Sequence, residues 1–466
     1  MFKIMKMSKY NFITYDIEGN LIAYNFITGI TSLTKVMKRD VCRFTQLFLT
    51  DTEISRTSCE EYAEAVRSML QSGILVAGDA DENVVCDSMH YNEVYDSKLS
   101  LTILPTGKCN FSCPYCYEAP KSFHREAMTI DNQNALLKFV QKNIPNHRAL
   151  RVSWFGGEPL LEPEIIKYLS DKFIKICKAR FLPYNAEMVT NGYYLDADMF
   201  DMLYKLKVYN YMITVDGLKE QHDKLRFTSN SMGSYDVIMK NLLMIRDSKQ
   251  YKFANIIIRV NVSSGFLDML DDFVSFISSS FSDDARFKIE FVPVSDLSSS
   301  KNSENNLSFD VNEMISHLHK NEVYMSKLYS DEFMTSQIAT ETKCTAALKN
   351  SYVITPDLSA YKCYVHFNNH DFNKVGHISL NGDFLLDDTL HKRWYLANKF
   401  IQKLPDSCKD CFYLPCCRQS NPGCPVRYYY SPSMESCTVK DEKSMEQLNE
   451  TILYVAHKKN INTIEL

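Results

Sequence analysis

Three cysteines near residue 110 have the spacing C-x3-C-x2-C. They are Cys109, Cys113 and Cys116, and they follow an apolar run, Leu99 to Leu104, whose composition is that of a buried strand. Three thiolates this close together can hold three corners of one metal centre, and the next cysteine along the chain is Cys177. The spacing therefore predicts a 4Fe-4S cluster that has one iron without a protein ligand.

Zinc is the alternative metal for the same three thiolates. A closed zinc site takes four protein ligands, and the local candidate for the fourth is His124. The two interpretations differ in whether one coordination position stays open.

The motif, with Tyr115 directly before its last cysteine, resembles the signature of the radical S-adenosylmethionine (SAM) superfamily. The resemblance implies that the open iron chelates the amino and carboxylate groups of SAM. It also implies that Cys109, Cys113 and Cys116 are the catalytic centre, where reduction of the cluster cleaves SAM to methionine and a 5'-deoxyadenosyl radical.

The composition indicates a protein of two or three domains that stays in the cytoplasm. The chain has 466 residues, a net charge of -5 and no block of like charge, so neither nucleic acid nor an anionic membrane is an expected partner. The N-terminal stretch lacks an apolar signal region, and no run approaches the roughly 20 apolar residues of a membrane span.

The 15 cysteines of this chain point to metal ligation, because a reducing compartment does not maintain a disulfide framework. Three lie in the first motif and eight between Cys344 and Cys437. The four scattered ones are predicted to be buried small hydrophobes: Cys42, Cys59, Cys86 and Cys177.

From residue 99 the chain alternates between strand and helix patterns. Strands are predicted at 99–104, 150–155, 185–190, 210–215, 255–263 and 287–293. The clearest helix is 162–180, where apolar residues recur at the three-four spacing of a core-facing stripe. Such alternation predicts a parallel sheet, and six such units resemble the partial (β/α)6 barrel of the radical SAM family.

Polar or glycine-rich motifs directly follow the first four of these strands. After the cysteines come Gly156-Gly157-Glu158-Pro159, Thr190-Asn191-Gly192 and Asp216-Gly217. Each alone is typical of an ordinary turn, but parallel strands bring their carboxyl ends to one rim. The sequence therefore predicts one site at that rim.

The resemblance implies SAM contacts for residues of these motifs. Paired glycines allow close approach to a ligand, Glu158 offers a carboxylate to the SAM amino group, and Arg226 offers a bidentate partner to its carboxylate. The predicted cofactor-binding residues are Tyr115, Gly156, Gly157, Glu158, Thr190, Asn191, Asp216, Arg226 and Asn261.

The pattern of the N-terminal stretch predicts a separate module of strands and helices. Alternating residues on both sides of Glu18-Gly19-Asn20 predict a hairpin, followed by helices near 41–49 and 58–72, a short strand, and the acidic run 79–82. The pattern resembles the winged-helix leader-peptide-binding domains of peptide-modifying radical SAM enzymes. A dimerisation or purely structural appendage is the alternative.

The second cysteine field resembles the SPASM extension of radical SAM proteins, which carries two auxiliary 4Fe-4S clusters. Mapped by that pattern, Cys344, Cys363 and Cys424 hold the first auxiliary cluster. The second is held by Cys408, Cys411, Cys417 and Cys437. A pair of zinc ribbons is the alternative, given the C-x2-C of Cys408 and Cys411.

Three departures from the family pattern bear on this mapping. Leu358 stands where a glycine is usual, and six residues separate Cys417 from Cys424 where three are common. Cys416 is an additional thiol that either takes no part or completes the first auxiliary cluster.

Together these features predict an α/β protein with four segments. They are a winged-helix-like α+β domain (1–95), a radical SAM partial barrel (96–310), a helical linker (311–340), and a SPASM domain with a C-terminal helix (341–466). The expected cofactors are SAM and three 4Fe-4S clusters, one of them SAM-binding and two auxiliary.

The expected activity is radical modification of a ribosomally made precursor peptide, with an external electron donor of the flavodoxin or ferredoxin type. Thioether cross-linking is the first expectation for the bond formed, because an open iron of the first auxiliary cluster would bind a substrate thiolate. The alternatives are oxidation of a protein Cys or Ser residue, as in sulfatase maturases, and a non-catalytic zinc or iron-sulfur scaffold.

Overall fold

The computed structural model divides the chain into two compact units. The residues that it describes are 4–50, 54, 56–116, 126–262, 266–293, 344–367, 370–396, 411–415, 442–458 and 461–466. The large-sheet unit comprises the described parts of Asp96–Phe333 and Lys349–Trp394. The small-sheet unit comprises the described parts of Met1–Tyr95, Met334–Leu348 and Tyr395–Leu466.

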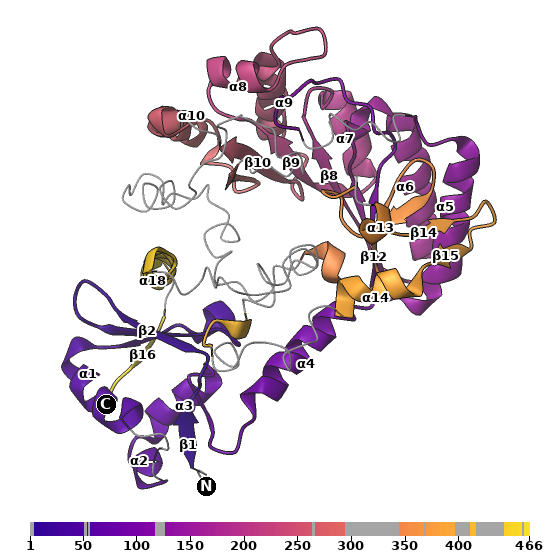
Figure 1. Ribbon diagram of the computed structural model, residues 1–466. Coiled ribbons are helices and arrows are strands. Elements are labelled where there is room, and N and C mark those ends of the chain that lie inside the picture. The colour runs from indigo at the N-terminus through magenta and orange to yellow at the C-terminus, as the bar shows by residue number, and fades with distance from the viewer. Residues whose placement is uncertain are drawn as a thin grey trace. The chain divides into compact units, whose positions relative to one another are not determined.

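The large-sheet unit is built on a ten-stranded sheet that contains six consecutive parallel strands. These six lie side by side in chain order, as Figure 1 shows for β8, β9 and β10. They are β6 (Lys98–Ile103), β7 (Ala149–Trp154), β8 (Tyr184–Thr190), β9 (Val208–Thr214), β10 (Asn255–Val262) and β11 (Phe287–Pro293). The α/β class and the six predicted strands are confirmed.

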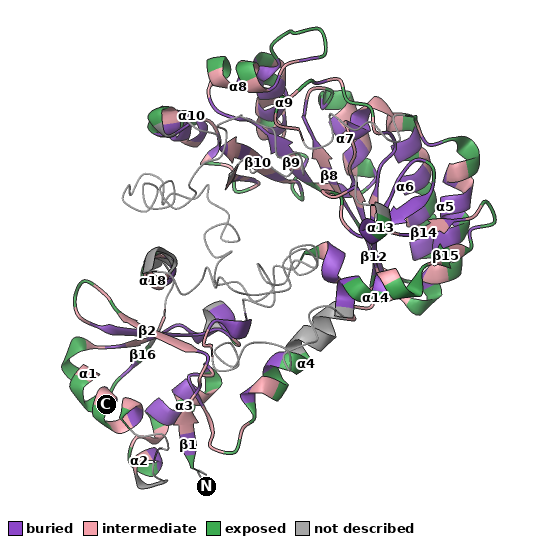
Figure 2. Ribbon diagram, in the orientation of Figure 1, coloured by how far each residue is buried: buried purple, intermediate pink, exposed green. Residues whose placement is uncertain are grey.

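Helices follow the strands and cover the sheet (Figure 1). They are α5 (Ile130–Asn143), η3 (Ile144–Asn146), η4 (Pro159–Leu161), α6 (Pro163–Lys178), α7 (Ala197–Lys205), α8 (Lys219–Leu225), α9 (Tyr235–Asp247), η5 (Leu267–Met269) and α10 (Leu270–Phe281). Helix α6 begins at Pro163, where a missing N–H costs no hydrogen bond. Its Ile166, Leu169 and Phe173 form a buried stripe, and Figure 2 shows buried and exposed residues on the same helix.

The same sheet continues beyond β6 with strands from a later part of the chain. β12 (Ser351–Ile354) pairs in parallel with β6, and three antiparallel strands follow. The remaining elements here are β13 (Ser359–Tyr361), α13 (His370–Asn373), β14 (Lys374–Ile378), β15 (Phe384–Leu386) and α14 (Asp388–Leu396). The sequence suggests one domain over 341–466, whereas the structure divides this stretch, because β12 fills the outer hydrogen-bonding edge of β6.

The small-sheet unit begins with the predicted hairpin. β2 (Asn11–Tyr15) and β3 (Leu21–Asn25) are antiparallel, and the turn between them holds Gly19 at a φ of 83°. The Asp16 side chain stabilises this turn by accepting hydrogen bonds from Glu18 N at 3.0 Å and Asn20 N at 2.9 Å. The hairpin is confirmed.

Helices of the small-sheet unit cover a core that includes Phe44, Phe48 and Met69. The elements are β1 (Met5–Met7), η1 (Gly29–Ser32), β4 (Thr34–Val36), α1 (Lys38–Phe44), η2 (Thr45–Leu49), α2 (Arg56–Glu61), α3 (Ala63–Gln71), β5 (Leu75–Ala77), α4 (Glu82–Val94) and η7 (Thr345–Ala347). The helix predicted near 58–72 is two helices, because Tyr62 leaves helical geometry with a ψ of 41°.

The fourth strand of the small sheet comes from the other end of the printed sequence. β16 (Asn462–Ile464) pairs in parallel with β4, giving the strand order β16-β4-β3-β2 (Figure 1). Helix α18 (Glu442–Lys458) precedes it and contacts β3. No pattern in the sequence predicts this pairing.

Two predicted segments fall outside the part of the chain that the structure describes: the polar linker at 295–310 and the helical connector at 311–340. Among the helices that are described, none combines the length and the apolar character that crossing a membrane requires.

Candidate active site

The three cysteines of the C-x3-C-x2-C motif lie on the loop that leaves the carboxyl end of β6. Cys109 is exposed, and Cys113 and Cys116 are half-buried. Ser112 N donates a hydrogen bond of 3.0 Å to Phe227 O. The cysteine loop is therefore anchored on the segment that follows α8.

The described residues do not form a site for a single metal ion. In the described part of the chain, no three His, Cys, Asp or Glu side chains are grouped to hold one ion. His124, the candidate fourth zinc ligand, lies outside the described residues. Three thiols on one loop remain a suitable donor set for an iron-sulfur cluster.

Gly156 and Gly157 allow the loop after β7 to pass directly against the cysteine loop. A Cβ on Gly157 would lie 2.3 Å from Lys108 O, and a Cβ on Gly156 would lie 2.5 Å from Thr106 O. Glu158 N donates to the same Lys108 O at 2.8 Å. In the structure, the close approach that these glycines permit is thus an approach to protein backbone.

The Glu158 carboxylate ties the loop after β7 to the loop after β8. The residue is 0% exposed, and its Oε1 accepts hydrogen bonds from Thr190 Oγ1 at 2.7 Å and Leu160 N at 3.0 Å. Its Oε2 accepts a bond of 2.8 Å from Asn191 N. Burial raises the pKa of Glu158 above its ordinary value, and these hydrogen bonds oppose that rise.

Asn191 connects this brace to the cysteine loop. Its Nδ2 donates to Asn110 Oδ1 at 2.7 Å and lies 4.0 Å from Cys109 Sγ. Asn110 was not among the predicted site residues, although its position directly after the first cysteine of the motif is a usable signal.

A second brace joins the loops after β6, β9 and α8 to β10. Arg226 Nη1 donates to Tyr115 OH at 2.7 Å, and that hydroxyl donates in turn to Asp216 Oδ2. Arg226 and Asp216 form an ion pair of 3.8 Å and are 8% and 0% exposed. Asn261 N donates to Asp216 Oδ1 at 2.7 Å. Burial raises the pKa of Asp216, and the charge of Arg226 opposes the rise.

His222 supports this brace and was missed by the sequence analysis. Asp216 N donates to His222 Nδ1 at 3.1 Å, and His222 Nε2 lies 3.0 Å from Ser234 Oγ, which donates to Arg226 O at 2.7 Å. Nδ1 is therefore the acceptor nitrogen and Nε2 carries the proton. Burial lowers the pKa of His222 to about 3, so the imidazole is neutral. The sequence feature that could have identified His222 is its position on α8, four residues before Arg226.

Two buried donors at this rim have no hydrogen-bond partner among the residues that the structure describes. They are Arg226 Nε and Asn110 Nδ2. Burying a polar N–H without a partner is unfavourable, so both atoms favour a bound group that carries acceptor atoms. Such donors beside three thiols fit a cluster together with a carboxylate-bearing ligand.

Residues 103–270 match the model of the Radical SAM superfamily. These residues belong to that superfamily. The match begins at the last residue of β6 and ends at the first residue of α10, so it contains the three motif cysteines and both braces. The large parallel sheet is thus the partial barrel of a radical SAM domain.

Named relatives and solved structures resemble larger parts of the chain. The cysteine-type anaerobic sulfatase-maturating enzyme of Clostridium novyi is 25% identical over 344 residues, which are 70% of this chain and 87% of the relative. The radical SAM cyclopropyl synthase TigE of Paramaledivibacter caminithermalis is 24% identical over 187 residues, 37% of this chain and 38% of that enzyme.

A solved structure of anSMEcpe with bound AdoMet and Kp18Cys peptide has a TM-score of 0.56 and 19% identity to this chain. The alignment covers 78% of this chain and 100% of anSMEcpe. At this identity the likeness shows a shared fold.

The second cysteine field, which lies outside the residues that match the family model, is described only in part. Cys344 is exposed, and Cys363 and Cys411 are half-buried. The Cys363 backbone is fixed by Asn373, whose Oδ1 accepts from Cys363 N at 2.8 Å and whose Nδ2 donates to Cys363 O at 2.7 Å. The other predicted ligands lie outside the described residues: Cys408, Cys417, Cys424 and Cys437, together with the additional thiol of Cys416.

Leu358, which stands where a glycine is usual in the family pattern, has a backbone conformation that favours glycine. Its φ is 67°, in the left-handed region, and its side chain is 1% exposed. Leu358 N donates to Thr355 O at 2.9 Å, which closes the turn between β12 and β13. A left-handed φ is unfavourable for leucine, and here it occurs together with a buried side chain and a hydrogen-bonded turn.

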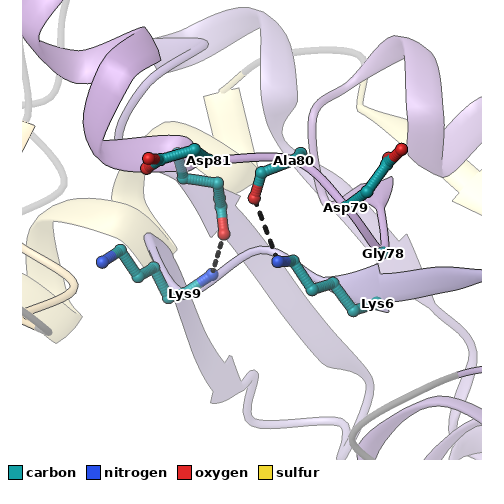
Figure 3. Close-up of a pocket in the computed structure, with 7 residues that line it drawn as sticks. Lys6, Lys9, Gly78, Asp79, Ala80 and Asp81 are labelled. Atoms are coloured by element: carbon teal, nitrogen blue, oxygen red, sulfur yellow. Dashed lines mark hydrogen bonds between the residues drawn. The ribbon is translucent and has the colours of Figure 1, made fainter.

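The small-sheet unit has a hollow of about 330 Å³ beside the predicted acidic run (Figure 3). Lys6 Nζ donates to Ala80 O at 3.0 Å, and Lys9 N donates to Glu82 Oε2 at 3.2 Å. The charged residues that line the hollow are Lys6, Lys9, Asp79, Asp81 and Glu82. This mixture of signs selects neither anions nor cations.

One of the four scattered cysteines contradicts its predicted burial. Cys59, Cys86 and Cys177 are buried as expected, but Cys42 is exposed. Its helix α1 turns Phe44 into the core instead, so the polar face of α1 carries the cysteine.

Proposed function

We propose that this chain is a radical SAM enzyme that modifies a side chain of a ribosomally made precursor peptide. The observation that carries the proposal is the joining of four loops at one rim, where hydrogen bonds of Glu158, Asn191 and Asp216 surround a three-cysteine loop. An inert scaffold has no need for such a rim.

Cys109, Cys113 and Cys116 are the proposed ligands of the SAM-binding 4Fe-4S cluster. When bound, the cluster supplies the electron that cleaves SAM to methionine and a 5'-deoxyadenosyl radical, which removes a hydrogen atom from the substrate. The protein's task is to position the substrate hydrogen and to keep water away from the rim.

Arg226 is the proposed partner of the SAM carboxylate. Its Nη1 is already held by Tyr115, and its buried Nε has no partner among the described residues, so Nε is the donor available to a ligand. Asp216 and Tyr115 fix the guanidinium from one side. We propose that they position Arg226, while Asn110, Thr190, Asn191 and Asn261 line the rim.

Glu158 acts as a positioning residue in this proposal. Its carboxylate already accepts three hydrogen bonds and is 0% exposed. The expectation that it pairs with the SAM amino group therefore requires this brace to open, and it stays a prediction. Gly156 and Gly157 contribute by bringing the braced loop against the cysteine loop.

A peptide substrate is supported by the relatives' names. The enzyme from Clostridium novyi is named for acting on sulfatases, and anSMEcpe was solved with a peptide bound. In this chain we propose that the small-sheet unit binds the precursor's leader by adding a peptide strand to its sheet, because main-chain pairing tolerates many sequences. The electron donor is proposed to be a flavodoxin or ferredoxin.

Thioether formation is the proposed chemistry, with two auxiliary clusters held by the second cysteine field. In a thioether-forming reaction the 5'-deoxyadenosyl radical would take a hydrogen atom from a substrate carbon, and the substrate thiol would lose its proton. Formation of the carbon–sulfur bond would then pass one electron to an auxiliary cluster, so that the peptide loses two hydrogens in all. The first auxiliary cluster would take its ligands from Cys344, Cys363 and Cys424, and the second from Cys408, Cys411, Cys417 and Cys437.

Oxidation of a single Cys or Ser residue is the second candidate. It is favoured by the 87% coverage of the sulfatase-maturating relative. Tandem mass spectrometry of a co-expressed peptide distinguishes the two reactions. A thioether suppresses fragments between the joined residues and leaves one cysteine unreactive to alkylation, whereas single-residue oxidation leaves fragments on both sides.

The proposed cluster assignment is tested with Cys113→Ala, using Cys42→Ala as the matched control. Cys42 is exposed on α1 and has no role in the proposed cluster. With dithionite under anaerobic conditions, Cys113→Ala is expected to produce no 5'-deoxyadenosine above background. Cys42→Ala is expected to match the wild type. Wild-type production by Cys113→Ala would refute the assignment.

A further inference from the structure

The edge of the small sheet at β4 is closed by a strand from the chain itself. β16 pairs with β4 in parallel through Asn462↔Thr34, Thr463↔Lys35 and Ile464↔Val36. In Figure 1, β16 is the yellow strand beside the indigo strands of this unit. We propose that this edge is the docking site for the extended peptide partner, and that residues 462–466 occupy it until the peptide replaces them.

The occupant shows what the edge recognises. Ile464 is 1% exposed within the core of the unit, and Leu466, two residues on, packs against the same core. Thr463 and Glu465 are exposed, so apolar residues alternate with polar ones, as they do on a half-buried strand. Backbone pairing along β4 and sockets for alternate side chains form a peptide-recognition site.

Charge adds a second element to this recognition. Glu465 lies 3.4 Å from Arg39 Nη2 at the start of α1, and both side chains are largely exposed. An exposed pair of this kind contributes little affinity but favours one register and one sign of charge. The partner is therefore an extended peptide with two aliphatic residues separated by an acidic one.

The attachment of β16 is short, which makes replacement feasible. β16 shares three register pairs with β4 and pairs with no other described strand of the sheet, whereas β3 shares three pairs with β4 and five with β2. Helix α18 holds the preceding segment on the unit through the hydrogen bond from Thr14 Oγ1 to Asn449 Oδ1 and through the buried side chain of Ile452. A displaced β16 thus stays at a high local concentration, so that only a better-matched peptide excludes it.

This inference rests on the proposed peptide substrate, but its test needs neither SAM nor a cluster reaction. Amide hydrogen exchange of the full chain, read by mass spectrometry, compares residues 461–466 with β3. We expect 461–466 to exchange at least about tenfold faster than β3, because β16 opens while the rest of the sheet stays formed. Equal rates in the two segments would overturn the proposal, since β16 would then open only when the whole unit unfolds.

A binding measurement tests replacement directly. The probe is a fluorescent synthetic hexapeptide with the sequence of residues 461–466, INTIEL. Ile464→Ser weakens the resident strand by removing its core contact, and it is expected to bind the probe at least about tenfold more tightly than the wild type. The matched control is Glu465→Gln, which changes an exposed side chain of the same strand and should bind within about twofold of the wild type.

A second variant keeps the core intact if Ile464→Ser does not fold. Thr463→Pro disturbs the strand backbone at an exposed side chain, with Thr463→Ser as its control. Stronger probe binding by Thr463→Pro supports replacement, and unchanged binding by both strand variants overturns it. Production of 5'-deoxyadenosine without peptide separately reports whether the proposed radical SAM activity is present.

Discussion

The two sheets of this protein are assembled in different ways. In the large sheet, β6 to β11 lie in the order in which the chain makes them, and each pairs with its predecessor. In the small sheet, β2, β3 and β4 also follow chain order, but the next position is filled by β16, far away in the sequence. The first arrangement is local in sequence and the second is not.

This difference determines how much of each sheet can be predicted from the sequence. Each strand of the large sheet ends at the same rim, so polar residues that directly follow β6, β7, β8 and β9 meet there without further information. The small sheet depends on the pairing of β16 with β4, and no sequence pattern in either strand identifies the other as its partner. The rim is therefore expected to tolerate less change than the small-sheet unit.

Gly157→Ala is expected to have the largest effect. Its Cβ would lie 2.3 Å from Lys108 O, a backbone atom of the cysteine loop, so the loop must shift. Displacement of catalytic groups by about 1 Å costs roughly a hundredfold in rate, and we expect at least that loss of 5'-deoxyadenosine production. Gly78→Ala, whose Cβ would lie 3.2 Å from Ile4 O, is the control and should retain activity. Similar rates for both variants would show that the rim tolerates movement.

Asp216→Asn tests the buried ion pair of the rim. The substitution leaves the charge of Arg226 buried without its partner, which is expected to lower the free energy of unfolding by about 3 kcal/mol. Thermal unfolding under anaerobic conditions measures the change. The control is Asp236→Asn, which breaks the exposed pair with Lys219 and should leave the free energy of unfolding nearly unchanged. Equal losses would mean that the pair at the rim is no more important than one on the surface.

His222 predicts a pH dependence of the same brace. Its pKa is about 3 when folded and about 6.5 when unfolded, so the unfolded chain binds the extra proton between these values. The stability that neutral His222 contributes is complete above pH 6.5 and is lost as the pH falls toward 3. At pH 5 the loss is about 2 kcal/mol.

His222→Asn removes this titration while keeping an oxygen to accept the Asp216 N–H. The free energy of unfolding of the wild type minus that of the variant should fall by about 2 kcal/mol from pH 7.5 to pH 5. The pKa values of Glu158 and Asp216 are raised, which opposes acid destabilisation, but this cancels in the difference. A difference that does not vary with pH would contradict the neutral buried imidazole.

Phe412→Ala, in the small-sheet unit, has the smallest expected effect. The Phe412 ring packs on Phe12 at 5.6 Å and on Phe26 at 5.7 Å, which ties the described segment at 411–415 to the hairpin. Aromatic contacts of this kind contribute about 1 kcal/mol, so a modest decrease in melting temperature is expected. Phe181→Ala removes a ring that is 96% exposed and serves as the control. No difference between the two would show that this contact does not hold the unit together.

Individual residues show how far sequence reasoning extends. Asp216 and Asn261 were predicted to share a site because both lie near the carboxyl ends of strands. In the structure, Asn261 N donates a hydrogen bond of 2.7 Å to Asp216 Oδ1. His222 was missed because a lone histidine on a helix has no distinctive pattern. Cys42 was predicted to be buried but is exposed, because residue type alone does not indicate which face of a helix is buried.

The sequence by itself determined the six parallel strands, the rim where their loops meet and the three-cysteine loop, because these depend on hydrophobic periodicity and on residues near each strand end. Only the tertiary structure decided that β12 extends the large sheet and that β16 pairs along the β4 edge. It also decided that Glu158 is buried and that its carboxylate accepts three hydrogen bonds. The physical reason is that strand pairing between distant segments is fixed by backbone hydrogen bonds and shared burial. Backbone groups are the same in every residue, so such pairings leave little trace in the sequence.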